Sequence, residues 1–153
     1  MTGAAAGTGL QRLIDARLDA AFGLYTELIE ALDETQLRRS LPVPSNPIGL
    51  QLWCVVGARE TWARALETGI WGPFRCSISS SEGTRKHDVV AGALATSASA
   101  FRAAAVARPD DDARTDFKLG LLEHESQHLG QLLRYVLGLG IEPPPGWKKR
   151  FAL

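Results

Sequence analysis

The sequence predicts an all-α fold, a four-helix bundle with a long crossover connection between the second and third helices. Four segments repeat apolar residues with the 3.6-residue period of a helix face, and no segment shows a convincing strand pattern. The chain has 153 residues, 45% hydrophobic and 22% charged, which is typical of one globular domain. We therefore expect a single helical-bundle domain over residues 1–153, with a frayed N-terminus at 1–8 and an extended C-terminal tail at 141–153.

The first two helices are separated by three prolines within six residues, which a helix interior does not tolerate. Apolar spacing places the first helix at about residues 9–36. The second begins at a capping Ser45 or Asn46, has a proline in its first turn and runs to about Glu67.

The second half of the chain begins with a long irregular connection over residues 68–85, which is rich in glycine and serine. An alanine-rich third helix is expected at about residues 88–106. Three consecutive aspartates, from Asp110 to Asp112, then cap the fourth helix, which ends near Gly138 and Gly140.

The fourth helix carries His124 and His128, four residues apart. Residues at this spacing lie one above the other, about 6 Å apart along the axis, so two imidazoles can converge on one divalent metal. Glu125 completes the string His-Glu-x-x-His, but in zinc proteases that string follows a sheet, which this sequence does not predict. The alternative is that both histidines are hydrogen-bonded residues of the core or its rim.

A third ligand would come from the facing second helix, where Cys54 is the soft ligand that points inward. A thiolate with two imidazoles is an acceptable zinc set that leaves a fourth position for water or substrate. The alternative is a small buried hydrophobe, which is what most free cysteines are. A metal-free redox role for Cys54 ranks lowest, because a reactive cysteine requires an electropositive, accessible setting and Cys54 is expected in an apolar one. Cys76 is the second cysteine of the chain, and we expect both thiols to be reduced.

The charge balance argues against several classes of partner. Seventeen basic and seventeen acidic residues cancel, so no net field favours nucleic acid or an anionic membrane. No apolar run is expected to reach membrane-spanning length, and the N-terminal residues lack the pattern of a secretory signal. We expect a cytoplasmic protein whose partner is a small-molecule substrate.

Two segments resemble the DinB/YfiT-like superfamily of metal-dependent enzymes. They are residues 45–60, SNPIGLQLWCVVGARE, and residues 123–132, EHESQHLGQL, which are followed by Gly140 and Pro143. The resemblance extends over most of the chain in length and helix order, and its specific part is these two segments. It implies a four-helix bundle in which one histidine of the second helix and two of the last bind a divalent metal, often nickel or zinc. Characterised relatives include thiol-dependent transferases and isomerases, and relatives are often dimers.

By this resemblance His124 and His128 carry over as metal ligands, while Cys54 stands where the family has its first histidine. One function that follows is a zinc- or nickel-dependent transferase, isomerase or hydrolase acting on a small molecule, with these three residues as ligands. The other is a catalytically inactive bundle that has lost its metal and acts as a small-molecule binding or stress-related protein. A homodimer is implied by the resemblance alone.

Two further interpretations concern residues around this set. Gln131 either orients a metal ligand or is a surface amide. The aromatic residues of the second helix, the connection and the tail are interpreted as core rather than as a binding cage: Trp53, Trp62, Trp71, Phe74 and Trp147.

Overall fold

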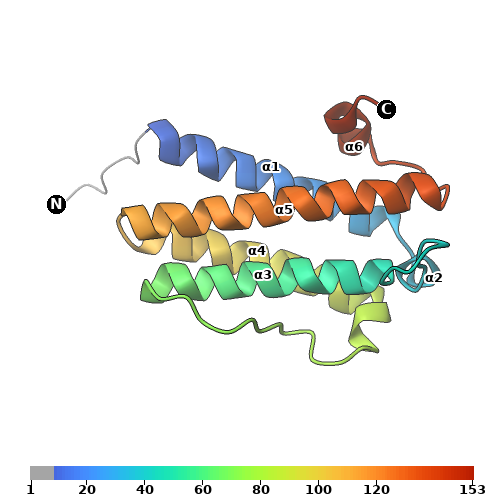
Figure 1. Ribbon diagram of the computed structural model, residues 1–153, viewed down its shortest axis with the longest axis horizontal. Helices are drawn as coiled ribbons and strands as arrows, with labels where there is room; N and C mark the ends of the chain where they lie inside the picture. The colour runs from blue at the N-terminus through green and yellow to red at the C-terminus, as the bar shows by residue number, and fades with distance from the viewer. Residues whose placement is uncertain (1–8) are drawn as a thin grey trace.

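The computed structural model describes residues 9–153, and every regular element in that range is helical (Figure 1). The expected all-α fold is confirmed, and the expected frayed terminus at 1–8 lies outside the described residues. Four long helices lie alongside one another: α1 (Gly9–Ala31), α3 (Ile48–Thr68), α4 (His87–Ala107) and α5 (Asp112–Gly138). The short elements are α2 (Glu34–Leu37), the 3₁₀-helix η1 (Gly83–Arg85) and α6 (Pro145–Phe151).

The first helix ends earlier than the apolar period predicts. α1 stops at Ala31, and the separate short helix α2 starts after Asp33. The Asp33 carboxylate accepts a hydrogen bond from the backbone N–H of Gln36, and the Gln36 side chain accepts one from the N–H of Asp33, at 2.7 and 2.8 Å. This reciprocal capping box starts a new helix inside a segment whose apolar spacing predicts a single continuous helix.

The connection between α3 and α4 runs back along the outside of α3 (Figure 1). The backbone N–H of Arg75 donates to Thr61 Oγ1 at 3.2 Å, and the indole N–H of Trp53 donates to the carbonyl of Ile78 at 2.9 Å. Residue numbers therefore rise along the connection as they fall along α3. As a result, α3 and α4 point in the same direction.

Two glycines of α3 make room for this connection. A Cβ at Gly49 would lie 1.9 Å from the carbonyl oxygen of Thr84, and a Cβ at Gly57 would lie 2.1 Å from the Phe74 ring. Both distances are far below van der Waals contact, so any side chain at either position would push the connection off α3. In contrast, a Cβ at Gly23 on α1 would meet nothing within 4 Å.

The C-terminal segment is helical over α6, so the extended tail predicted for residues 141–153 is wrong over that part, and residues 141–144 before it have no regular structure. Pro145 occupies the first turn of α6, where its missing N–H leaves no intrahelical hydrogen bond unmade. Trp147, in the middle of α6, is fully buried, and its indole N–H donates to the carbonyl of Leu24 at 2.7 Å. Burial of this one large side chain fastens α6 to α1.

The apolar side chains form two clusters of buried residues. One includes Tyr25 and Leu132, and the other includes Phe22, Phe101 and Leu121. α4 contributes to both clusters through residues spaced along one face. Within residues 9–153, α4 is also the one helix that is long and apolar enough, by length and composition, to cross a membrane. A run of this length was not predicted from the sequence. A core helix that is rich in alanine has the same composition.

Candidate functional site

His124 and His128 lie on successive turns of α5, and both side chains are partly buried. Their ring centres are 4.5 Å apart, and the ring planes are inclined by 45°. The Nδ1 atom of each ring is buried and has no hydrogen-bond partner among residues 9–153. The two imidazoles therefore lie together as their spacing predicts. The two Nδ1 atoms lack the partners that buried nitrogen atoms normally have, which favours the metal site over the alternative of hydrogen-bonded core or rim residues; the choice stays a prediction.

Both imidazoles are neutral at physiological pH. Burial lowers the pKa of His124 to about 4, and the charges of His128 and Arg59 act in the same direction. Burial also lowers the pKa of His128. A neutral imidazole keeps one nitrogen lone pair, which is the form that a metal requires of its ligand.

The ring spacing fits a shared metal ion. A ligating nitrogen lies about 2.0–2.1 Å from zinc, which places the metal roughly 3.2 Å from the ring centre. Two rings on one ion can therefore have centres up to about 6.4 Å apart. The observed separation of 4.5 Å falls within that limit, and the unpartnered Nδ1 atoms are available as donors. The two histidines fit as two members of a ligand set.

Cys54 is half-buried on α3, with a free thiol. Gln51 Nε2 donates to Tyr135 Oη at 3.5 Å, and Arg59 pairs with Glu125, so the α3 segment between these contacts faces the α5 segment that contains His128. Burial raises the pKa of the Cys54 thiol, which is therefore protonated at neutral pH. A protonated thiol is a poor nucleophile, which argues against the metal-free redox role.

The third ligand is not assembled with the histidines. Among the residues that the structure describes, no group of three or more His, Cys, Asp or Glu side chains is arranged to hold a metal ion. The structure brings His124 and His128 together but does not bring Cys54 to them. The set of three ligands stays a prediction, because it requires Cys54 to move.

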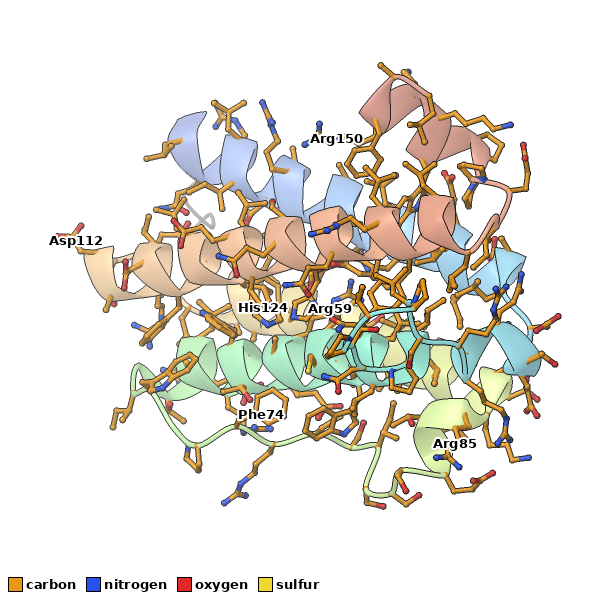
Figure 2. All side chains as sticks on the ribbon, turned by 45° about the vertical axis from the view of Figure 1, so that its right-hand side comes forward. Arg59, Phe74, Arg85, Asp112, His124 and Arg150 are labelled. Carbon is orange, nitrogen blue, oxygen red and sulfur yellow. The ribbon has the colours of Figure 1, made fainter. Side chains whose placement is uncertain are left out.

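A buried ion pair that the sequence did not suggest lies beside the histidines (Figure 2). Arg59 Nε and Nη2 donate to the two carboxylate oxygens of Glu125 at 2.7 and 2.9 Å, and the two side chains are 1% and 0% exposed. Arg59 Nη1 donates to the carbonyl of Leu94 on α4 at 3.1 Å. Figure 2 shows Arg59 and His124 in the same space between α5 and α3.

Two aromatic residues of α1 complete this cluster. The Arg59 guanidinium lies 4.3 Å from the ring centre of Phe22 and 5.0 Å from that of Tyr25. Tyr25 Oη donates to the backbone carbonyl of Glu125 at 2.8 Å. All four long helices meet at this ion pair, which fixes the turn of α5 between the two histidines. The signal that could have indicated it is charge within apolar stripes: Arg59 lies on the buried face of α3, and Glu125 and Lys118 lie on that of α5.

An aromatic cleft adjoins the histidines on the side of His124. The Trp62 ring centre lies 5.7 Å from that of His124 and 4.7 Å from that of Trp71, whose ring lies 6.3 Å from Phe117. The cleft has a volume of about 530 Å³. Its remaining lining consists of Asp116, Leu119, Gly120 and Glu123.

The aromatic residues are therefore not uniformly core. Trp147 is fully buried, whereas Trp71 is 52% exposed and Phe74 is 47% exposed. Gln131, considered as a residue that orients a ligand, is exposed on α5. Cys76 is half-buried on the connection, and its Sγ donates to the carbonyl of Trp53 at 3.6 Å.

Comparison with known proteins assigns nothing further. No family model matches the chain, and no curated protein and no solved structure matches it either. The resemblance to the DinB/YfiT-like superfamily stays a prediction that rests on residues 45–60 and 123–132.

Proposed function

We propose that this protein is a four-helix bundle, with the connection between α3 and α4 as its crossover, that binds a divalent metal and acts on a small molecule. His124 and His128 are the proposed ligands. One observation carries the proposal: two neutral imidazoles, 4.5 Å apart, each have a buried nitrogen without a partner. Leaving a polar atom buried and unpaired costs about 1–3 kcal/mol, and a shared zinc or nickel ion satisfies both atoms at once.

Cys54 is the proposed third ligand, reached by a shift of its side chain toward His128. Because the metal binds the thiolate, ligation releases a proton from a thiol whose pKa is raised by burial. Metal affinity should therefore fall as the pH falls. A thiolate ligand would add negative charge to the metal and so weaken its activation of water relative to three imidazoles, which favours thiol transfer or isomerisation over hydrolysis.

The protein's own groups have defined parts in this proposal. A bound metal supplies Lewis-acid activation of a substrate oxygen or thiol. The two histidines stay neutral and keep their lone pairs, since their pKa values are lowered. The ion pair between Arg59 and Glu125 holds the α5 turn between them and is a positioning element.

A metal-free role is the second candidate, and one observation favours it. No third His, Cys, Asp or Glu side chain joins the two histidines within residues 9–153. In this case Cys54 replaces the metal-binding histidine without taking over its role, and the chain is an inactive bundle that binds a small molecule or serves in a stress response.

The deciding experiment is the metal content of the purified full chain by mass spectrometry. About one zinc or nickel ion per chain is expected, lost in Cys54→Ala and in His128→Ala. His87→Ala is the matched control, since His87 lies on α4 and bonds the carbonyl of Ile29 at 2.9 Å. Metal that is lost in His87→Ala as well would point to general unfolding instead of ligation.

The variant Cys54→His separates the two candidates. Absence of metal from the native chain, together with metal in Cys54→His, would refute the first candidate and select the second. Absence of metal from both would show that the histidine pair is not a metal site.

We also propose a cytoplasmic homodimer. Light scattering on the purified chain should give twice the chain mass of 16.5 kDa, and a mass of one chain would refute the dimer.

A further inference from the structure

The aromatic cleft has a distinctive charge pattern. Three of its walls are the ring systems of Trp62, Trp71 and Phe117, and two of its remaining four lining residues are the carboxylates Asp116 and Glu123. No Lys or Arg lines it. An aromatic face has a negative potential, so rings and carboxylates together attract positive charge.

The two carboxylates are not neutralised elsewhere. Neither Asp116 nor Glu123 forms an ion pair or a side-chain hydrogen bond among the described residues, whereas Asp110 and Asp111 of the same region pair with Lys118 and Arg114. Side chains seven residues apart on a helix point to similar sides, about 10 Å apart along the axis. The chain therefore holds two uncompensated negative charges two turns apart along one side of α5.

Gly120 lies between the two acids and admits the Trp62 indole. A Cβ at Gly120 would lie 2.9 Å from Trp62 Nε1, so a side chain here would displace the ring. Without one, Trp62 lies against the helix with His124 on one side and Trp71 on the other. The aromatic wall is therefore continuous from the cleft to the histidine pair.

We propose that this cleft binds small organic cations, with an alkylated ammonium group against Trp62 and Trp71 and its charge facing Asp116 and Glu123. The proposal rests on the proposed function, because it names the substrate class of that same site. A cation within about 6 Å of a ring centre is attracted by the ring, and the carboxylates raise its local concentration. A neutral ligand of the same shape gains the apolar contact alone.

The test uses choline and its uncharged analogue 3,3-dimethylbutan-1-ol, titrated into the full chain by calorimetry after removal of metal with EDTA. We expect millimolar binding of choline and at least about tenfold weaker binding of the analogue. Trp71→Leu should weaken choline binding about threefold or more, and the double variant Asp116→Asn/Glu123→Gln should abolish the preference for choline. Glu30→Gln, which neutralises an exposed carboxylate on α1, is the matched control and should change neither affinity.

Three outcomes would overturn the proposal: equal affinity for the two ligands, no binding of choline at tens of millimolar, or loss of binding in Glu30→Gln to the same extent as in the cleft variants. Since metal is removed beforehand, failure of the metal proposal leaves the choline result unchanged. Failure of the choline experiment likewise leaves the metal content of the native chain unchanged.

Discussion

Replacement of Arg59 by methionine should destabilise the protein severely. The change removes two charge-assisted hydrogen bonds to Glu125 and leaves that carboxylate in a site with no exposed area. The lost bond to the carbonyl of Leu94 adds little, because this oxygen still accepts from Ser97 Oγ at 3.2 Å. Breaking one side of a buried ion pair costs about 3–5 kcal/mol, mainly through the stranded charge. We expect that loss in the free energy of unfolding of Arg59→Met.

The double variant Arg59→Met/Glu125→Leu should recover most of the loss. Replacement of both partners by apolar side chains leaves no stranded charge, and buried pairs replaced in this way are often neutral or stabilising. Chemical denaturation of the native chain, both single variants and the double variant gives the coupling energy between the sites. We expect at least about 2 kcal/mol.

Arg102→Met is the matched control for the single variant. Arg102 pairs with Asp19 at the same 2.7 Å distance as Arg59 with Glu125, but its side chain is 50% exposed. Its loss should cost less than about 1 kcal/mol. The reasoning is refuted if Arg59→Met costs no more than Arg102→Met, or if the two single-variant costs simply add in the double variant.

The pH dependence of Arg59→Met provides a second readout. Burial raises the pKa of Glu125, and Arg59 offsets part of that rise. Without Arg59 the folded carboxyl binds a proton at a higher pH than the unfolded one, which titrates near about 4.3. Acidification therefore favours the folded variant relative to its unfolded state, so the penalty should shrink between about pH 7 and pH 5. A penalty that grows over this range would contradict the assignment of the cost to Glu125.

Four other variants test the fold and the histidine pair. Gly49→Ala should cost about 1–3 kcal/mol or more because its Cβ meets the backbone of the connection, whereas Gly23→Ala should stabilise by about 0.5–1 kcal/mol, both by denaturant titration. Trp147→Ala should cost about 3–5 kcal/mol and expose α6 to proteolysis, and unchanged protease resistance would contradict its role as anchor. His124 has a folded pKa of about 4 and an ordinary value of 6.5, so the unfolded metal-free chain binds its proton first and stability falls as the pH drops from 6.5 to 4. The fall should be about 1–2 kcal/mol, since partial exposure screens the effect, and His124→Phe should remove it.

The helical architecture could be predicted from the sequence because it depends on periodicity and helix-breaking residues. The prolines before Ile48 and the aspartates before α5 mark helix starts that the structure confirms within a few residues. The break after Ala31 could not be found this way, since a capping box can interrupt a helix without a proline or glycine. The helix α6 could not be predicted, because the three prolines before Gly146 indicate an extended segment. Its conformation depends on burial of Trp147, which is a tertiary contact.

Of the candidate site, only the approach of the two histidines within one helix could be predicted from the sequence. The spacing of His124 and His128 fixes their approach, because both belong to one helix. Whether Cys54 reaches them depends on how α3 packs against α5, and a sequence pattern does not specify this to within a metal–ligand distance. The pairing of Arg59 with Glu125 depends on the same packing, which is why two charged residues in apolar stripes were not recognised as partners.

The connection between α3 and α4 joins two halves of the chain, and both halves contribute residues to the candidate site. A cut in the exposed part of the connection, near Ser80, would leave α1 to α3 in one fragment and α4 to α6 in the other. Arg59 would belong to the first fragment, and Glu125 with the two histidines to the second. Each fragment alone would expose one member of the ion pair to water, which removes any desolvation cost until they associate. Association would bring that cost back, so reassembly of the two fragments would depend on the apolar clusters around the ion pair rather than on the pair itself.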